Sequence, residues 1–194
     1  MSVIDELLEA NRGYARSFDR GHLPMPPARR VAVVTCMDAR ILPSRILGID
    51  IGEAHVIRNA GGRAREALRS LVISQQLLGP REVAVIHPTD CGMLAFTNAQ
   101  LRAKVKQTLG ADAGGIDFLP FTDVEQSVRE DVDFLEASPL IPRDIPIRGF
   151  VYDVKTGIVT EVAVRSLPRA PSRSSRRPPR QAPRAPHPRS ARSA

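Results

Sequence analysis

Short runs of aliphatic residues alternate with longer, more polar stretches along most of the chain. The aliphatic runs are residues 31–35, 54–57 and 82–86, and the longer stretches that predict helices are 64–78, 93–109 and 123–135. The first and last aliphatic runs lack polar alternation, which is typical of strands covered on both faces of a parallel sheet. This order of elements predicts an α/β fold with a mostly parallel sheet flanked by helices.

Further elements are expected at both ends of this pattern. Apolar residues recur at helical spacing over residues 3–8 and predict a helix, with Ser2 as its amino-terminal cap and Gly13 as its stop signal. Residues 148–154 and 158–164 flank a Lys-Thr-Gly turn, which predicts a β-hairpin after the last helix.

The positive charge of the chain is concentrated near its carboxyl end. The formal net charge is +7, but residues 166–194 contain eight arginines and no acidic residue, so the remainder is close to neutral. The same residues include seven prolines, six serines and only one large aliphatic residue, and they cannot bury enough apolar surface to offset the entropy of ordering. We therefore expect one folded domain over residues 1–165 and a disordered tail over residues 166–194.

Composition also limits the expected partners and location. No aromatic residue interleaves the arginines of the tail, so no specific nucleic-acid binding is expected. No run of about 18 apolar residues predicts a membrane span, and the amino end lacks the basic and apolar regions of a secretory signal. Two cysteines are too few for a disulfide scaffold. These features predict a cytoplasmic protein without membrane contact.

Residues with metal-binding chemistry follow the predicted strands. Cys36, Asp38 and Arg40 come directly after the run at 31–35, and Cys91 follows the run at 82–86. Ligands in parallel α/β sheets bind outside the carboxyl ends of the strands, where these residues are expected to lie. Thiolate, carboxylate and imidazole groups are the ligands that zinc prefers, and a catalytic zinc site keeps one position free. The pattern therefore indicates a candidate zinc site.

Three short segments of the chain resemble the signature segments of a known protein family. Cys-Met-Asp-Ala-Arg at residues 36–40, Arg-Asn-Ala-Gly at 58–61 and Thr-Asp-Cys-Gly at 89–92 are similar to the signature segments of β-class carbonic anhydrases. Their order and separations match that family, and the likeness extends over residues 2–164. The resemblance implies a zinc enzyme that reversibly hydrates carbon dioxide to bicarbonate.

The resemblance also implies roles for individual residues. In the family, the first cysteine and the cysteine of a His-x-x-Cys segment bind zinc, which corresponds to Cys36 and Cys91. The aspartate and arginine of the first segment form a dyad that orients the zinc-bound water, which corresponds to Asp38 and Arg40. In some members the aspartate becomes a fourth zinc ligand, so Asp38 is both a dyad residue and a candidate ligand.

One position departs from the family pattern. Pro88 stands three residues before Cys91, where the family has its histidine ligand, and proline has no donor atom for a metal. His87 is one position earlier, and it faces away from Cys91 if it belongs to the strand but can approach if the chain bends there. Three interpretations stay open: His87 substitutes as a ligand, zinc binds weakly through Cys36, Asp38 and Cys91, or no zinc binds.

The functional alternatives follow from this departure. The first hypothesis is a carbonic anhydrase, a lyase acting on carbon dioxide and bicarbonate with Zn²⁺ as its cofactor. The second is a degenerate, non-catalytic relative that acts as a binding or regulatory protein. The third is a hydrolase of a carbon dioxide analogue such as carbonyl sulfide. The resemblance further implies a homodimer in which the amino-terminal helix reaches over the partner.

Overall fold

The computed structural model describes residues 2–164, and the tail predicted over residues 166–194 lies outside them. The helices are α1 Val3–Ala15, α2 Pro43–Leu47, α3 Ala64–Leu78, α4 Asn98–Leu109 and α5 Val124–Ala137, with 3-10 turns η1 Ala60–Gly62 and η2 Gly92–Leu94. The strands are β1 Val31–Cys36, β2 Ala54–Asn59, β3 Glu82–Pro88, β4 Ile147–Tyr152 and β5 Val159–Glu161. Among the described residues, no helix is long and apolar enough to cross a membrane.

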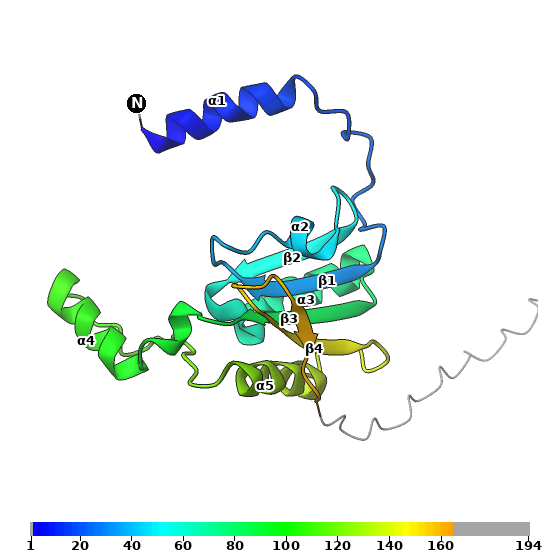
Figure 1. Ribbon diagram of the computed structural model, residues 1–194. Helices are drawn as coiled ribbons and strands as arrows, with labels where there is room; N and C mark the ends of the chain where they lie inside the picture. The colour runs from blue at the N-terminus through cyan, green and yellow to red at the C-terminus, as the bar shows by residue number, and fades with distance from the viewer. Residues whose placement is uncertain (1, 165–194) are drawn as a thin grey trace, which may run out of the picture.

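The strands form one sheet in the order β2-β1-β3-β4-β5 (Figure 1). β1 runs parallel to both β2 and β3, and β3 runs parallel to β4. β5 is antiparallel to β4, as the predicted hairpin requires. The prediction of an α/β fold with a mostly parallel sheet flanked by helices is confirmed.

Each face of the sheet has its own core. On one face, Val83 and Val85 of β3 pack with buried residues of α3 and α5, including Leu71 and Val128. On the other face, Ile86 belongs to a second core that also contains both cysteines. Successive side chains of β3 therefore alternate between the two cores, as they must in an extended strand.

The helix expected at residues 93–109 is divided in the structure. Residues 92–94 form the turn η2, and α4 begins only at Asn98. Thr97 caps this helix because its hydroxyl accepts from the Gln100 backbone N–H while the Gln100 side chain accepts from the Thr97 N–H. This capping box is a local sequence signal that places the start of the helix at Asn98, later than the expected start at residue 93.

The helix α1 stands apart from the sheet and its covering helices (Figure 1). The capping box of Ser2 with Asp5 starts it as expected, but it passes Gly13 and ends at Ala15. None of its residues is buried, and its apolar side chains, including Leu7 and Leu8, are exposed. The segment between α1 and β1 contains no regular element.

Candidate active site

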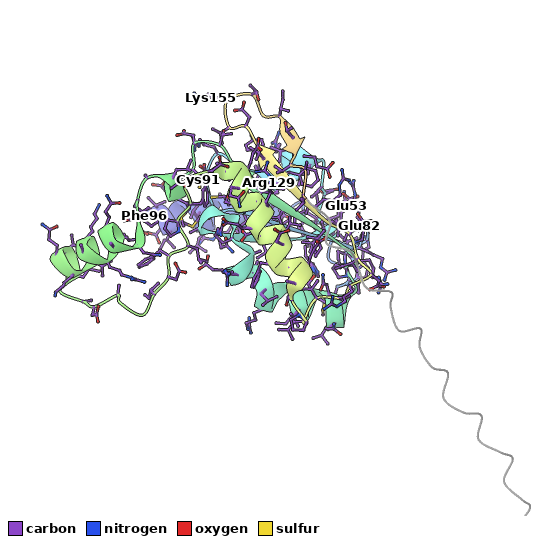
Figure 2. The ribbon with its side chains drawn as sticks, turned by 90° about the horizontal axis from the view of Figure 1, so that it is seen from below. Glu53, Glu82, Cys91, Phe96, Arg129 and Lys155 are labelled. Atoms are coloured by element: carbon purple, nitrogen blue, oxygen red, sulfur yellow. The ribbon has the colours of Figure 1, made fainter. Side chains whose placement is uncertain are left out.

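The segments with metal-binding chemistry meet at one edge of the sheet. β1, β2 and β3 pair in parallel, so their carboxyl ends share that edge. Cys36 ends β1 beside Asn59, the last residue of β2. Pro88 ends β3 shortly before Cys91. Figure 2 shows Cys91 at the opposite end of the sheet from Glu82, where β3 begins.

Cys36 and Cys91, which we call the thiol pair, lie side by side. Their Sγ atoms are 3.9 Å apart, both residues are buried, and neither forms a disulfide. The hydrogen bond between the two sulfurs lowers the pKa of Cys36 to about 6. The same hydrogen bond, together with burial, raises the pKa of Cys91. The pair therefore favours one thiolate and one thiol that donates to it.

The spacing of the thiol pair fits zinc. Two thiolates that bind one tetrahedral zinc ion at about 2.3 Å have their sulfurs about 3.8 Å apart. The observed separation of 3.9 Å needs almost no adjustment. However, no group of three or more His, Cys, Asp or Glu residues among residues 2–164 is arranged to hold a metal. The arrangement supplies two sulfur atoms at the right separation for zinc, and it identifies no third protein ligand among residues 2–164.

Asp38 and Arg40 form the predicted ion pair next to Cys36. Arg40 Nε donates to Asp38 Oδ1 at 3.0 Å and Arg40 Nη2 donates to Asp38 Oδ2 at 2.7 Å. These hydrogen bonds, with one from the Arg40 backbone, hold the pKa of the Asp38 carboxyl below its usual value. The carboxylate is thus kept ionised and fixed in orientation, although the arginine remains partly exposed.

Two further charged residues fix this arrangement. Arg40 Nη1 donates to Asp90 Oδ2 at 2.8 Å, which ties the loop after β1 to the loop after β3. Arg58 Nε donates to the Cys36 carbonyl at 3.1 Å, and Arg58 Nη2 donates to the Asp38 carbonyl at 2.8 Å. Asp90 and Arg58 both belong to the motif segments, but no role was predicted for either residue. Their charge and their position at strand ends were the available signal.

Gly62 lets the loop after β2 pass under the strand ends. Its φ is 76°, a left-handed conformation that side chains disfavour. A Cβ atom there would lie 3.0 Å from the Cys36 amide nitrogen and 3.1 Å from the Ile86 carbonyl oxygen. The glycine is therefore required for the close approach of this loop to β1 and β3.

His87 lies on the face of the sheet that α5 covers and is fully buried. Its Nδ1 is 2.8 Å from Ser127 Oγ, whose own hydroxyl donates to the Val124 carbonyl. Its Nε2 is 3.2 Å from both the Gly62 carbonyl oxygen and Asp131 Oδ2. Both ring nitrogens thus lie within hydrogen-bond distance of buried oxygen atoms on this face of the sheet, away from the two cysteines.

The strand explains why His87 is not with the thiol pair. β3 continues without a bend through Pro88, which still pairs with Tyr152 of β4. Val83, Val85 and His87 alternate with Ile86 and Pro88, so the proline ring belongs to the face that carries the thiol pair. The position on the correct face is therefore occupied by a residue without a donor. This placement does not support the prediction of His87 as a ligand.

His87 and its buried partners have the residue types of a hydrolase triad, but they are closed to substrate. Ser127, His87 and Asp131 are at most 1% exposed, so no substrate reaches the serine hydroxyl. Asp131 Oδ2 also accepts from the Ala64 amide at 2.9 Å, which joins α5 to the start of α3. This cluster is a structural link between β3, α3 and α5. The cluster was not predicted, because its members lie far apart in the chain.

Comparisons with known proteins bear on the same segments. The family model for carbonic anhydrase matches residues 31–159. Beta-carbonic anhydrase 1 of Mycobacterium tuberculosis is 44% identical over 165 residues, which cover 84% of this chain and 99% of the relative. The chain belongs to the β-class carbonic anhydrase family. The resemblance predicted from the three motif segments is thereby confirmed.

Other members of the β-class carbonic anhydrase family and its relatives extend the comparison. The crystal structure of carbonic anhydrase from Streptococcus mutans has a TM-score of 0.81 and 52% identity, and the match covers 84% of this chain and 99% of that one. A carbon disulfide hydrolase of Acidithiobacillus thiooxidans is 32% identical over 177 residues, covering 81% of this chain and 89% of the relative. The β-class carbonic anhydrase fold is therefore shown, and relatives with another named activity share it.

Proposed function

We propose that this chain catalyses the reversible hydration of carbon dioxide to bicarbonate with zinc as its metal. The observation that carries the proposal is the thiol pair, with 3.9 Å between its sulfurs, next to the Asp38–Arg40 ion pair. The similarity to carbonic anhydrases at 44% and 52% identity supports the same reaction.

Cys36 and Cys91 are the residues that would hold the metal. Zinc bound there would act as a Lewis acid and make hydroxide available near neutral pH. Asp38 is the nearest additional donor along the chain, but both of its carboxylate oxygens accept from Arg40 and are free for a metal only if that contact opens. His87 takes no part in this proposal, because its ring nitrogens contact Ser127 and Gly62 on the face that α5 covers.

The ion pair supplies the positioning that the reaction needs. Asp38 is kept ionised and would accept a hydrogen bond from the hydroxide that bound zinc would supply, which would orient that oxygen toward carbon dioxide. Arg40 keeps the carboxylate in place through two side-chain hydrogen bonds. The guanidinium groups of Arg40 and Arg58 add positive charge near the site and favour the anionic bicarbonate.

The test measures metal content and activity on the same protein. The full chain is purified without chelators, its zinc per chain is determined by elemental analysis, and carbon dioxide hydration is followed by stopped flow. We expect close to one zinc per chain and measurable hydration, with both lost in Cys91→Ser. Protein that stays without zinc after zinc is added back, and that shows no hydration, would exclude the proposal.

A non-catalytic role is the second candidate function, and Pro88 favours it. The residue on the metal-facing side of β3 offers no donor, and no three-residue metal group exists among residues 2–164. In that case the chain would keep the fold and the two arginines at the site without tight zinc binding. Absent zinc in a folded, full-length protein that still binds bicarbonate would favour this candidate.

Hydrolysis of a carbon dioxide analogue is the third candidate. It is supported by the 32% identity to a carbon disulfide hydrolase, a relative named for an activity on such an analogue. Carbonyl sulfide and carbon disulfide can be assayed by release of hydrogen sulfide under the conditions used for carbon dioxide hydration. A higher kcat/KM for either sulfur compound than for carbon dioxide would favour this candidate.

A homodimer is proposed as the working assembly. The support is α1, which buries none of its own residues and exposes Val3, Leu7 and Leu8. Such an apolar helix face is stabilised when a second copy covers it. Sedimentation of the full chain should give a dimer, and Leu7→Asp should shift it toward monomer while Glu6→Gln on the same helix does not. A monomeric full chain would contradict this assembly.

A further inference from the structure

The thiol pair also has the arrangement of a dithiol that can be oxidised. Its sulfurs are 3.9 Å apart, and a disulfide bond needs about 2.05 Å, so an approach of about 1.9 Å joins them. Both cysteines are free, and they are the only two in the chain. No third cysteine competes for either sulfur, so oxidation within one chain leads to a single product.

The metal chemistry of the site leaves the thiol pair open to oxidation. A third protein ligand would hold zinc on the thiolates and block their reaction, but Pro88 has no donor atom and His87 is engaged on the other face. Asp38 is held by Arg40. Among residues 2–164 the two sulfurs are thus the only donors arranged for a metal, and the same lone pairs form either zinc–sulfur bonds or a disulfide.

We propose that Cys36 and Cys91 form a reversible intrachain disulfide with hydroperoxides, and that this oxidation and zinc binding exclude each other. This goes beyond the proposed function, and it holds whether or not the chain hydrates carbon dioxide.

The oxidation is a two-step reaction with hydrogen peroxide as the oxidant. One thiolate attacks a peroxide oxygen, the O–O bond breaks, and the products are a sulfenic acid and hydroxide. The second sulfur then attacks the sulfenic sulfur, the S–O bond breaks, and the leaving hydroxide takes up a proton as water. The two sulfurs lose two electrons in total, and the peroxide is reduced to water.

The burial of the pair favours this product over further oxidation. Cys36 is 5% exposed and Cys91 is 6% exposed, so only a small part of each residue is open to a reagent. The second sulfur already lies in hydrogen-bond contact with the first. Disulfide closure within the chain therefore competes well against attack by another peroxide or by a second chain.

The experiment uses the reduced full chain, made metal-free and exposed to hydrogen peroxide at a small molar excess. We expect two free thiols per chain to fall to none, the intact mass to fall by two hydrogen atoms, and one peptide to link Cys36 with Cys91. Dithiothreitol should restore both thiols. Sulfinic acid products, disulfides between chains, or persistence of both thiols would each overturn the proposal.

Matched variants separate the disulfide from general thiol damage and link it to zinc. In Cys36→Ser and Cys91→Ser the remaining thiol should gain oxygen instead of closing a disulfide. With one equivalent of zinc, oxidation of the unmodified chain should release one zinc per disulfide to a chromogenic chelator. Pro88→His with zinc should be oxidised at least about tenfold more slowly, because a third donor holds the metal on the thiolates. Equal rates in the zinc-loaded chain and the metal-free chain would overturn the exclusion between zinc and the disulfide.

These readouts do not depend on catalysis. A chain that forms the disulfide but hydrates no carbon dioxide when reduced and zinc-loaded would remove the proposed function and leave this inference standing. A chain that hydrates carbon dioxide with zinc, but keeps both thiols after exposure to peroxide, would exclude the disulfide and leave the proposed function standing.

Discussion

The Nδ1 atom of His87 lies 2.8 Å from Ser127 Oγ, on the face of the sheet opposite to the thiol pair. His87→Gln should therefore lower the free energy of unfolding by about 2 kcal/mol, because glutamine does not reproduce both buried hydrogen-bond contacts of the imidazole ring. Zinc affinity should stay unchanged. Chemical denaturation and zinc competition measure the two effects separately.

Cys91→Ser is the matched comparison for His87→Gln. It should remove zinc binding with little effect on the stability of the reduced, metal-free chain. A folded His87→Gln protein that loses zinc to the same extent as Cys91→Ser would show that the histidine is a ligand after all.

Pro88→His should restore a donor on the face of β3 that carries the thiol pair. The expected result is a zinc dissociation constant lower by at least about tenfold, or about 1.4 kcal/mol, together with faster carbon dioxide hydration. Zinc affinity is measured by chelator competition. Pro88→Ala is the control, since it removes the proline ring without adding a donor, and an equal gain in both variants would contradict the ligand explanation.

Arg40→Gln should weaken the hold on Asp38 and lower kcat/KM by about 10- to 100-fold. The pKa of the Asp38 carboxyl is held low chiefly by the Arg40 side chain, so in the variant it should rise toward its usual value. Activity should then disappear at a higher pH on the acid side of the profile than in the unmodified chain. Stopped-flow assays across pH measure this, and Arg45→Gln, an exposed arginine of α2, should behave as the unmodified chain does.

The thiol pair should release its first proton at low pH in the metal-free chain. The hydrogen bond from Cys91 stabilises the Cys36 thiolate and lowers the pKa of Cys36 to about 6, whereas the pKa of Cys91 is raised. The ultraviolet absorbance of thiolate should therefore rise by one thiolate per chain around that pH, without a second step near the usual thiol pKa of about 8.5. In Cys91→Ala the single step should move to higher pH. Two thiolates appearing together would contradict the coupling.

Gly62→Ala should destabilise the fold and displace Cys36. The added Cβ would meet backbone atoms at 3.0 Å in a left-handed conformation, so a loss of more than about 2 kcal/mol is expected. Gly157→Ala is a matched control, because Gly157 has a similar φ of 77° with nothing within 4 Å and should lose only about 1 kcal/mol. Denaturation of both variants tests the difference, and equal losses would show that the conformation alone, without the close approach to Cys36, is responsible.

Local patterns in the sequence were sufficient to predict the sheet and the place of the site. The aliphatic runs that became β1 and β3 are continuous, and each is followed at once by a chemically active segment. Parallel strands bring such segments to one edge, so the proximity of Cys36, Asp38 and Cys91 was predictable. The short helix α2 was not, because five residues between Pro43 and Gly48 carry too little periodicity.

The residue pattern alone was sufficient to predict a β-class carbonic anhydrase fold and to identify Pro88 at the position where the family has a ligand. The direction of the His87 side chain could be read only from the folded chain, because it depends on whether β3 runs straight to its end. Neighbouring side chains of a strand lie on opposite faces. A histidine at position 87 instead of 88 therefore contacts Ser127 and Asp131 and not the thiol pair. Those partners come from a helix about 40 positions later, and no local pattern predicts contacts over such a separation.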